Sequence, residues 1–189
     1  MLRTFFAVNI GETTRTSLTR VAQSMRQSLQ DKPIRVTWVE PRSMHITLRF
    51  IGDTEEKDLH RLFAIARAAT AGIQAFSVKV GGVDFFPSPK SPRVIFCHGE
   101  APSLQLIANQ LEERLAESGF APDKFPHRSH ITLGRLRDDR PPPGVAEQLK
   151  TALQEIPPAF IVNEIVLYKS ELKASAPVYT PIEKFLLES

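Results

Sequence analysis

Hydrophobic and polar residues follow two different periods along this chain. Blocks rich in β-branched and aromatic residues and bounded by Gly or Pro predict strands. They lie at residues 2–10, 34–41, 43–51, 76–86, 92–100, 129–136, 159–170 and 177–187. Blocks with apolar residues at helical spacing predict helices at 12–30, 54–71, 102–118 and 145–155. Strands and helices interleave throughout, which favours an α+β fold.

The segments between these blocks are short. Thr54, followed by two acids, is a candidate N-cap for the second helix. Residues 138–144, DDRPPPG, predict an exposed connection that is too short to be a domain linker. We therefore expect one domain over residues 1–189.

The tetrapeptide HITL occurs twice, at His45 and at His130, in the middle of two predicted strands. The copies are 130 − 45 = 85 residues apart, a little under half the chain, and the order of elements around them is similar. This repetition predicts two pseudo-symmetric lobes of antiparallel sheet, with helices packed outside and a cleft between the lobes.

Each HITL strand places its polar side chains on one face and its aliphatic side chains on the other. Because residues i and i+2 of a strand point to the same face, His45 and Thr47 face one way, and His130 and Thr132 do likewise. Two imidazoles, whose unperturbed pKa is about 6.5, can act together as general acid and general base. Threonine hydroxyls can hold phosphate oxygens. These groups suit in-line displacement at a phosphodiester without a metal.

Composition narrows the class of protein. Apolar residues make up 42% and charged residues 24%, as in a globular protein with a sizeable core. The net charge of +3 allows an anionic ligand but is not that of a protein that coats long nucleic acid. A single cysteine, Cys97, and no signal peptide or membrane span predict a cytoplasmic protein.

The stretches SMHITLRFIGD and SHITLGR resemble the two H-x-T-x signatures of the 2H phosphoesterase superfamily. More narrowly, the chain resembles the RNA 2′,3′-cyclic phosphodiesterases, also called 2′-5′ RNA ligases, over nearly its whole length. The similarity includes FFAVNI, FFPSPKSPRVIF and the C-terminal IVLYKSEL…YTPIEKF. Family members often have Pro before the second His, where this chain has Ser129.

The resemblance implies hydrolysis of a 2′,3′-cyclic phosphate at an RNA end, which leaves a 2′-phosphate. It implies His45 as proton donor, His130 as proton acceptor, and Thr47 and Thr132 as phosphate-binding groups. Reversible, ATP-independent 2′-5′ ligation would be the same chemistry with an RNA 5′-hydroxyl in place of water. The expected substrates are RNA ends or cyclic nucleotides. No metal, cofactor, membrane or obligate protein partner is expected, and we expect a monomer.

Other residues carry weaker signals. The family pattern favours Arg135 as a phosphate ligand, whereas strict strand alternation places it off the His130 face unless Gly134 introduces a bulge. The same alternation places Arg49 on the His45 face. Six further residues could belong to the site but are explained equally well by a structural role. His127 could line the cleft but suits a solvated loop, and His60 and His98 suit structural or exposed positions. Phe85, Phe86 and Tyr168 could stack a base but also suit the core.

Three alternatives stay open at this stage. The repeated histidines could be hydrogen-bonded core residues, or the fold could serve as a non-catalytic nucleotide- or RNA-binding module. A zinc hydrolase is disfavoured because neither tetrapeptide supplies a third ligand. No Walker-type phosphate loop is present, which argues against an ATP-consuming ligase.

Overall fold

The computed structural model describes residues 1–137, 142–152, 157–173 and 177–189. Its strands are β1 (Leu2–Asn9), β2 (Val36–Trp38), β3 (His45–Thr54), β4 (Phe76–Ser88), β5 (Ser91–Glu100), β6 (His130–Leu136), β7 (Phe160–Val162), β8 (Glu164–Leu172) and β9 (Pro177–Leu186). Its helices are α1 (Glu12–Ser28), α2 (Leu59–Thr70), α3 (Pro102–Glu117) and α4 (Val145–Thr151), with short 3₁₀ turns at Pro41–Ser43 and Glu56–Asp58.

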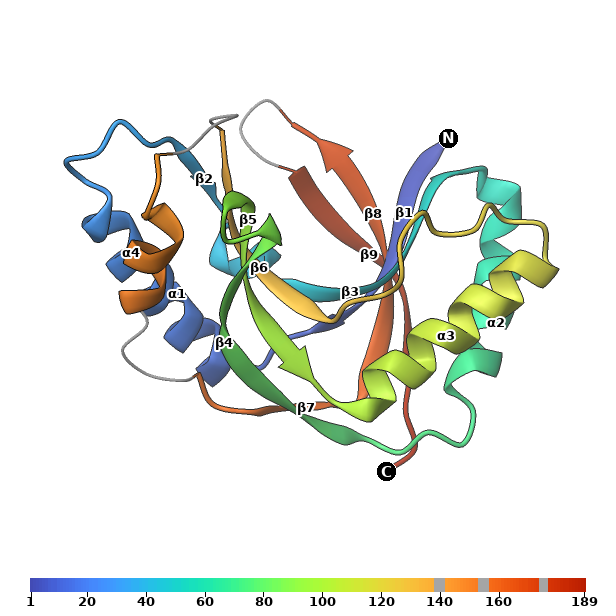
Figure 1. The fold of residues 1–189 in the computed structure, drawn as a ribbon. Helices are drawn as coiled ribbons and strands as arrows, with labels where there is room; N and C mark the ends of the chain where they lie inside the picture. Colours follow the sequence, from blue (N-terminus) through green and yellow to red (C-terminus); the bar gives the residue numbers. More distant parts are fainter. Residues whose placement is uncertain (138–141, 153–156, 174–176) are drawn as a thin grey trace.

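All strands belong to one curved antiparallel sheet, in the order β7-β4-β5-β6-β3-β1-β8-β9, with β2 paired to β6. The order reads the same from either end when four pairs of strands are exchanged: β1 with β5, β3 with β6, β4 with β8 and β7 with β9. Figure 1 shows the sheet curling into two lobes, with α1 and α4 outside one and α2 and α3 outside the other. The predicted α+β fold with two pseudo-symmetric lobes and outer helices is confirmed.

The two HITL strands are neighbours at the seam between the lobes. β3 pairs with β6 at Ile46 and Ile131, both of which are fully buried. In an antiparallel pair, this register sets His45 opposite Thr132 and Thr47 opposite His130 on the other face of the sheet. The lobes therefore share one sheet, and the pseudo-twofold axis passes between the two isoleucines.

Burial follows the predicted periodicities. The HITL strands bury Ile46, Leu48, Ile131 and Leu133 against the helices, and α3 buries Leu104, Ile107, Leu111 and Leu115 on one face. These side chains belong to one continuous hydrophobic cluster that extends through both lobes. No helix in the described part of the chain has the length and apolar character needed to cross a bilayer.

The predicted start of the second helix is wrong. Thr54 does not cap it: this residue ends β3, is 1% exposed, and its hydroxyl lies 2.7 Å from that of Thr4. The helix α2 begins only at Leu59, after the 3₁₀ turn. The pairing of β3 with β1 extends the strand to Thr54 and overrides the local capping signal.

Other boundaries also differ from the prediction, and the predicted strand 34–41 is reduced to β2, Val36–Trp38. The segment 159–170 breaks at Asn163, because β7 pairs with β4 in one lobe whereas β8 pairs with β1 in the other. The strands β4 and β5 run further than predicted, to a tight hairpin at Ser88 and Ser91. Residues 138–141 of the DDRPPPG connection and 153–155 of the last predicted helix lie outside the described residues.

Candidate functional site

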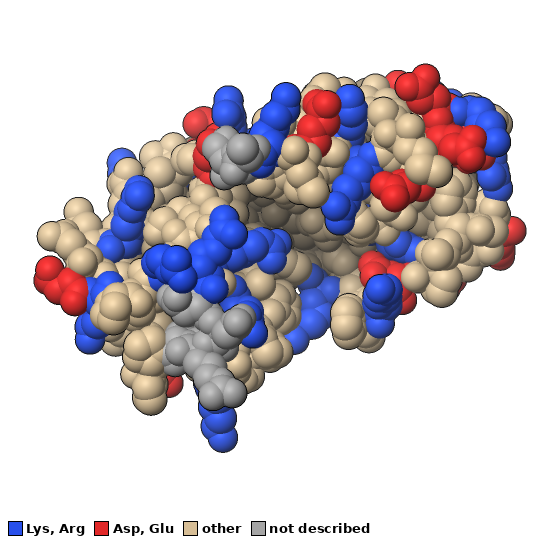
Figure 2. Space-filling view, turned by 90° about the horizontal axis from the view of Figure 1, so that it is seen from above, with Lys and Arg blue, Asp and Glu red and all other residues tan. Residues whose placement is uncertain are grey.

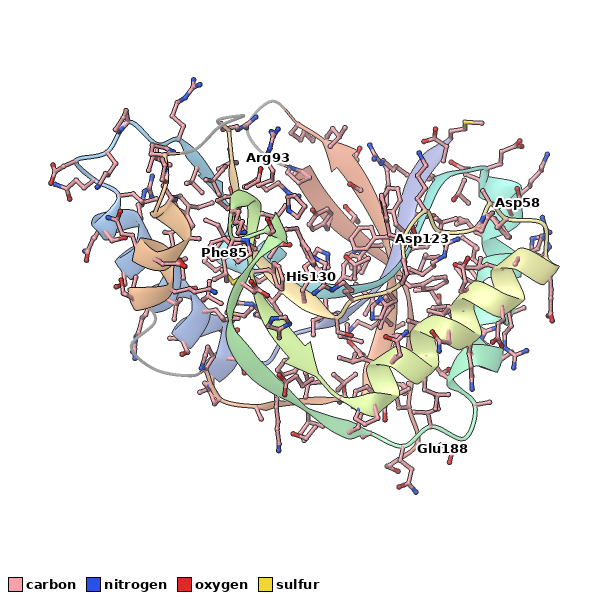
Figure 3. All side chains as sticks on the ribbon, viewed as in Figure 1. Asp58, Phe85, Arg93, Asp123, His130 and Glu188 are labelled. Carbon is pink, nitrogen blue, oxygen red and sulfur yellow. The ribbon has the colours of Figure 1, made fainter. Side chains whose placement is uncertain are left out.

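A cavity of about 450 Å³ opens above the seam, on the face of the sheet that carries the histidines. It is lined by all five predicted site residues, His45, Thr47, His130, Thr132 and Arg135. Figure 3 shows His130 between the two lobes, whereas the labelled Asp58 and Glu188 lie at the periphery of the molecule. The structure therefore brings the two repeats together at one site.

The two imidazoles are held in the same way. His45 Nδ1 donates to the carbonyl oxygen of Ser43 at 2.8 Å, and His130 Nδ1 donates to that of Arg128 at 2.6 Å. Each carbonyl lies two residues before its histidine. Because a carbonyl oxygen can only accept, both Nδ1 atoms carry a proton, and in the neutral rings Nε2 has the free lone pair. His45 Nε2 lies 3.1 Å from Thr47 Oγ1.

Aromatic rings flank both histidines. The His45 ring lies 5.1 Å from the Phe5 and Tyr179 rings, with Tyr179 edge-on. The His130 ring lies 5.0 Å from Phe86 and 5.3 Å from Phe96, both edge-on. These rings fix the planes of the imidazoles and exclude water from their flanks.

The site lowers the pKa of both histidines. For His45 the main cause is burial, and the positive charges of His130 and Arg135 act in the same direction, against the hydrogen bond to Ser43. Burial is also the main cause of the lowered pKa of His130, reinforced by Arg135, Arg128 and His98 and opposed by the Arg128 carbonyl. Both rings are therefore mainly neutral near pH 7.

A β-bulge brings Arg135 into the cavity. Along the β5–β6 pair, Phe96 faces Thr132 but Ile95 faces Gly134, so Leu133 is an extra residue in β6. The extra residue reverses the alternation, and Arg135 returns to the face that carries His130 and Thr132. The predicted exception at Gly134 is present.

The first repeat has the equivalent bulge, with the opposite result for its arginine. Ala7 faces Thr47 while Phe6 faces Arg49, so Leu48 is the extra residue. Arg49 is turned away from the cavity and is 5% exposed, in contact with Glu112. The prediction that Arg49 shares the His45 face is therefore wrong. Phe50, which is 85 residues before Arg135, lines the cavity instead.

Gly134 also lets β2 approach β6. A Cβ atom at this position would lie 2.8 Å from Val36 Cγ1 and 3.1 Å from Trp38 Cε3. We expect Gly134→Ala to lower the free energy of unfolding by about 1–3 kcal/mol through overpacking, measured by urea denaturation. Gly82→Ala is the matched control, because a Cβ there meets no atom within 4 Å. Equal stability of the two variants would contradict the close approach.

The other sequence candidates fall in different environments. Phe85 is 2% exposed and belongs to the core, so it cannot stack a base. Phe86 stacks on Phe96 at 4.1 Å, and the Tyr168 hydroxyl donates to Asn9 Oδ1. His98 Nε2 lies 3.4 Å from Asp84 Oδ2. None of these four lines the cavity.

His127 has a structural contact that the sequence did not indicate. Its Nε2 lies 2.8 Å from the hydroxyl of Ser129. Burial lowers the pKa of its ring, and the nearby backbone of Leu48 in the β3 bulge acts in the opposite direction. The residue thus links the segment before the second histidine to the first repeat. Ser129, directly before His130, supplies one end of this link.

Sequence reasoning missed several residues that line the cavity. They include three aromatics, a cation and an acid (Phe5, Phe50, Tyr179, Arg3 and Glu40). Arg3 lies over the Phe50 ring at 5.0 Å from its centroid. Only Phe50 carried a signal, because it follows the first motif at the position that Arg135 occupies after the second.

Within the described ranges, no group of three or more His, Cys, Asp or Glu side chains is arranged to hold a metal ion. The expectation of a metal-independent site therefore stays a prediction, for which a chelator provides the test.

Comparisons with known proteins agree with one another. The sequence matches the 2′-5′ RNA ligase superfamily over residues 14–174. It is 31% identical over 197 residues to the RNA 2′,3′-cyclic phosphodiesterase of Thermus thermophilus, covering 98% of this chain and 90% of that one. It is 29% identical over 187 residues to the Methanothermobacter thermautotrophicus protein of the same name, covering 98% and 99%.

Solved structures share the fold. The crystal structure of TT0787 of Thermus thermophilus superposes with a TM-score of 0.78 at 28% identity, covering 98% of both chains. That of E. coli LigT complexed with 3′-AMP superposes with a TM-score of 0.74 at 24% identity, covering 100% of this chain and 99% of LigT.

Proposed function

The chain belongs to the 2′-5′ RNA ligase superfamily, and we propose that it is an RNA 2′,3′-cyclic phosphodiesterase. Relatives that match nearly the full length of the chain bear that name. The observation that carries the proposal is the pair of imidazoles in one cavity, each with Nδ1 held by a carbonyl. This leaves two Nε2 atoms to exchange protons with one substrate.

In the proposed reaction, a water molecule attacks phosphorus while the bond from phosphorus to O3′ breaks. His130 Nε2 accepts a proton from the water, and His45, protonated when the reaction begins, donates its Nε2 proton to O3′. The products are a 2′-phosphate and a 3′-hydroxyl. The reaction leaves His45 neutral and His130 charged, and proton exchange with solvent restores the starting state.

Thr47, Thr132 and Arg135 are assigned to the phosphate. By register, each threonine stands opposite the histidine of the other repeat, so the two hydroxyls bracket the same centre as the two rings. Arg135 adds a cationic fork suited to non-bridging oxygens. Its twofold counterpart is Phe50, whose ring lies under the guanidinium of Arg3, so the two sides of the cavity are not equivalent.

The anionic substrate supplies the charge that the acid needs. The pKa of His45 is lowered by burial and by the positive charges of His130 and Arg135. A bound phosphate anion offsets those charges and raises the pKa of both rings. Substrate binding therefore favours the singly protonated pair on which the reaction depends.

This mechanism predicts two different pH profiles. The rate constant kcat/KM follows the free enzyme, in which the pKa of both histidines lies below 6.5. We expect a bell-shaped profile with its maximum on the acidic side of about pH 6.5. The profile of kcat follows the complex and should shift to higher pH. A kcat/KM that rises steadily from about pH 4 to 10 would contradict paired acid–base catalysis.

The direct test is turnover of a 2′,3′-cyclic nucleotide, with EDTA present, followed by identification of the product. We expect a 2′-phosphate at an unchanged rate with chelator. Ligation of an RNA 5′-hydroxyl to the same cyclic end is included in the proposal as the reaction with a different nucleophile. Tight binding without any turnover would instead favour the non-catalytic binding module.

The proposal also includes a single catalytic domain over residues 1–189 that acts as a monomer in the cytoplasm. The continuous hydrophobic cluster supports one domain. The only cysteine, Cys97, is buried, and burial raises the pKa of its thiol to about 12, so this thiol is protonated and unreactive at neutral pH.

A further inference from the structure

A row of polar and cationic positions leads from the cavity along β2 and β6. Thr37 pairs with Arg135, and both line the cavity. One step further out, Arg137 N donates to the carbonyl oxygen of Arg35 at 2.8 Å. Residues that pair in an antiparallel ladder share a face. Arg35, Thr37, Arg135 and Arg137 therefore lie on the cavity face, and Leu136 between the two β6 arginines is buried, at 6% exposure.

The outer arginine of β6, Arg137, is exposed, but a hydrogen bond restrains its side chain. The Nε of Arg137 donates to the hydroxyl of Thr37 on the neighbouring strand. This bond uses one of the five N–H groups of the guanidinium and fixes the plane of the group beside the cavity mouth. The acid that lines the cavity, Glu40, accepts a hydrogen bond from Arg42 at 2.8 Å, so its charge is matched there. Figure 2 shows Lys and Arg side chains around the hollow, on more than one side of it.

We propose that Arg137 and Arg35 form a second phosphate subsite, which binds the phosphodiester on the 5′ side of the terminal nucleotide. Two residues along a strand span roughly 6.6 Å, which is the scale of the separation between successive phosphates of one RNA strand. With the cyclic phosphate between the histidines and against Arg135, the preceding phosphate then falls at Arg137. On this basis the site binds an oligoribonucleotide end more tightly than a mononucleotide, an inference that rests on the proposed function.

The test compares two product-like ligands that end in the same 2′-phosphorylated nucleotide. One is the mononucleotide, and the other is a trinucleotide with two further phosphodiesters. We expect the trinucleotide to bind about tenfold more tightly, and Arg137→Ala to remove most of that difference while the Kd of the mononucleotide stays within about twofold. The slope of log Kd against log salt for the trinucleotide should fall by about one.

Two matched variants separate charge from structure. Arg137→Lys keeps the charge and should keep most of the preference for the trinucleotide. Arg26→Ala removes an exposed arginine from the outer helix α1 and should change neither Kd. Equal binding of the two ligands by the unmodified protein would overturn the subsite. So would an Arg137→Ala variant that loses both ligands to the same extent.

The binding measurement does not depend on turnover. A trinucleotide preference that requires Arg137, in a protein that hydrolyses no cyclic phosphate, would establish the subsite and refute the proposed function. Turnover of cyclic mononucleotide and trinucleotide with the same kcat/KM and the same Kd would support the function and refute the subsite.

Discussion

Alanine in place of either His45 or His130 is expected to lower kcat for a 2′,3′-cyclic phosphate by about 10²–10⁴-fold, the usual contribution of one general acid or base. Each variant removes the Nε2 on its side of the seam, and the fixed register allows neither ring to reach the other's position. The measurement is steady-state hydrolysis of a cyclic nucleotide with EDTA present.

The two substitutions should not add. Because both protons move in one displacement, the double variant is expected to be nearly as active as the slower single variant. His60→Ala is the control, since this histidine is exposed on α2 and lies away from the cavity. Both histidines are partly exposed, so the melting temperature should change little. A single variant with unchanged kcat would remove that residue from the mechanism.

The repeat alone was sufficient to predict which face of its strand each histidine shares with the threonine two residues later. Period-two alternation requires His45 and Thr47 to share a face, and the aliphatic residues between them are buried, as expected. The faces of these side chains follow from strand alternation alone, without any information on tertiary contacts. The same holds for α3, whose apolar face is the one that packs in the core.

The strand order could not be predicted from the repeat. Each half of the chain places its fourth strand in the opposite lobe, so that β4 pairs with β5 and β8 pairs with β1. This exchange is decided by pairings between residues far apart in sequence, for which local periodicity carries no signal. It also explains why 159–170 reads as one strand but divides at Asn163.

The local features that the sequence missed are those set by pairing. Thr54 is a residue type that often caps helices, but here it is the last residue of β3 and pairs with β1. Tyr179 reads as an ordinary residue of a C-terminal strand, yet its ring meets His45 edge-on. Gly134 gave a visible sign of its bulge because glycine is common at such positions. The equivalent bulge at Leu48 has no glycine and no comparable sign.

The two bulges give the two arginines that follow them opposite roles, and this difference can be measured. Arg135 is exposed in the cavity, so Arg135→Ala should leave stability within about 0.5 kcal/mol of the unmodified protein. The loss of its charge-assisted hydrogen bonds to the phosphate should lower kcat/KM by about 10–100-fold.

Arg49→Ala should have the converse effect. Arg49 is 5% exposed and donates to the carboxylate of Glu112, to the carbonyl oxygen of Phe50, and to that of Ala121 at 2.6 Å. Its removal takes away the donor that these carbonyls and Glu112 Oε2 share, although Glu112 Oε1 keeps the hydrogen bond from Asp123 N–H. Because Glu112 is also partly exposed, we expect a loss of about 2–4 kcal/mol. The readouts are urea denaturation and kcat/KM on the folded fraction. If instead Arg49→Ala impairs catalysis at unchanged stability, and Arg135→Ala only destabilises the protein, the bulges do not direct these side chains as described.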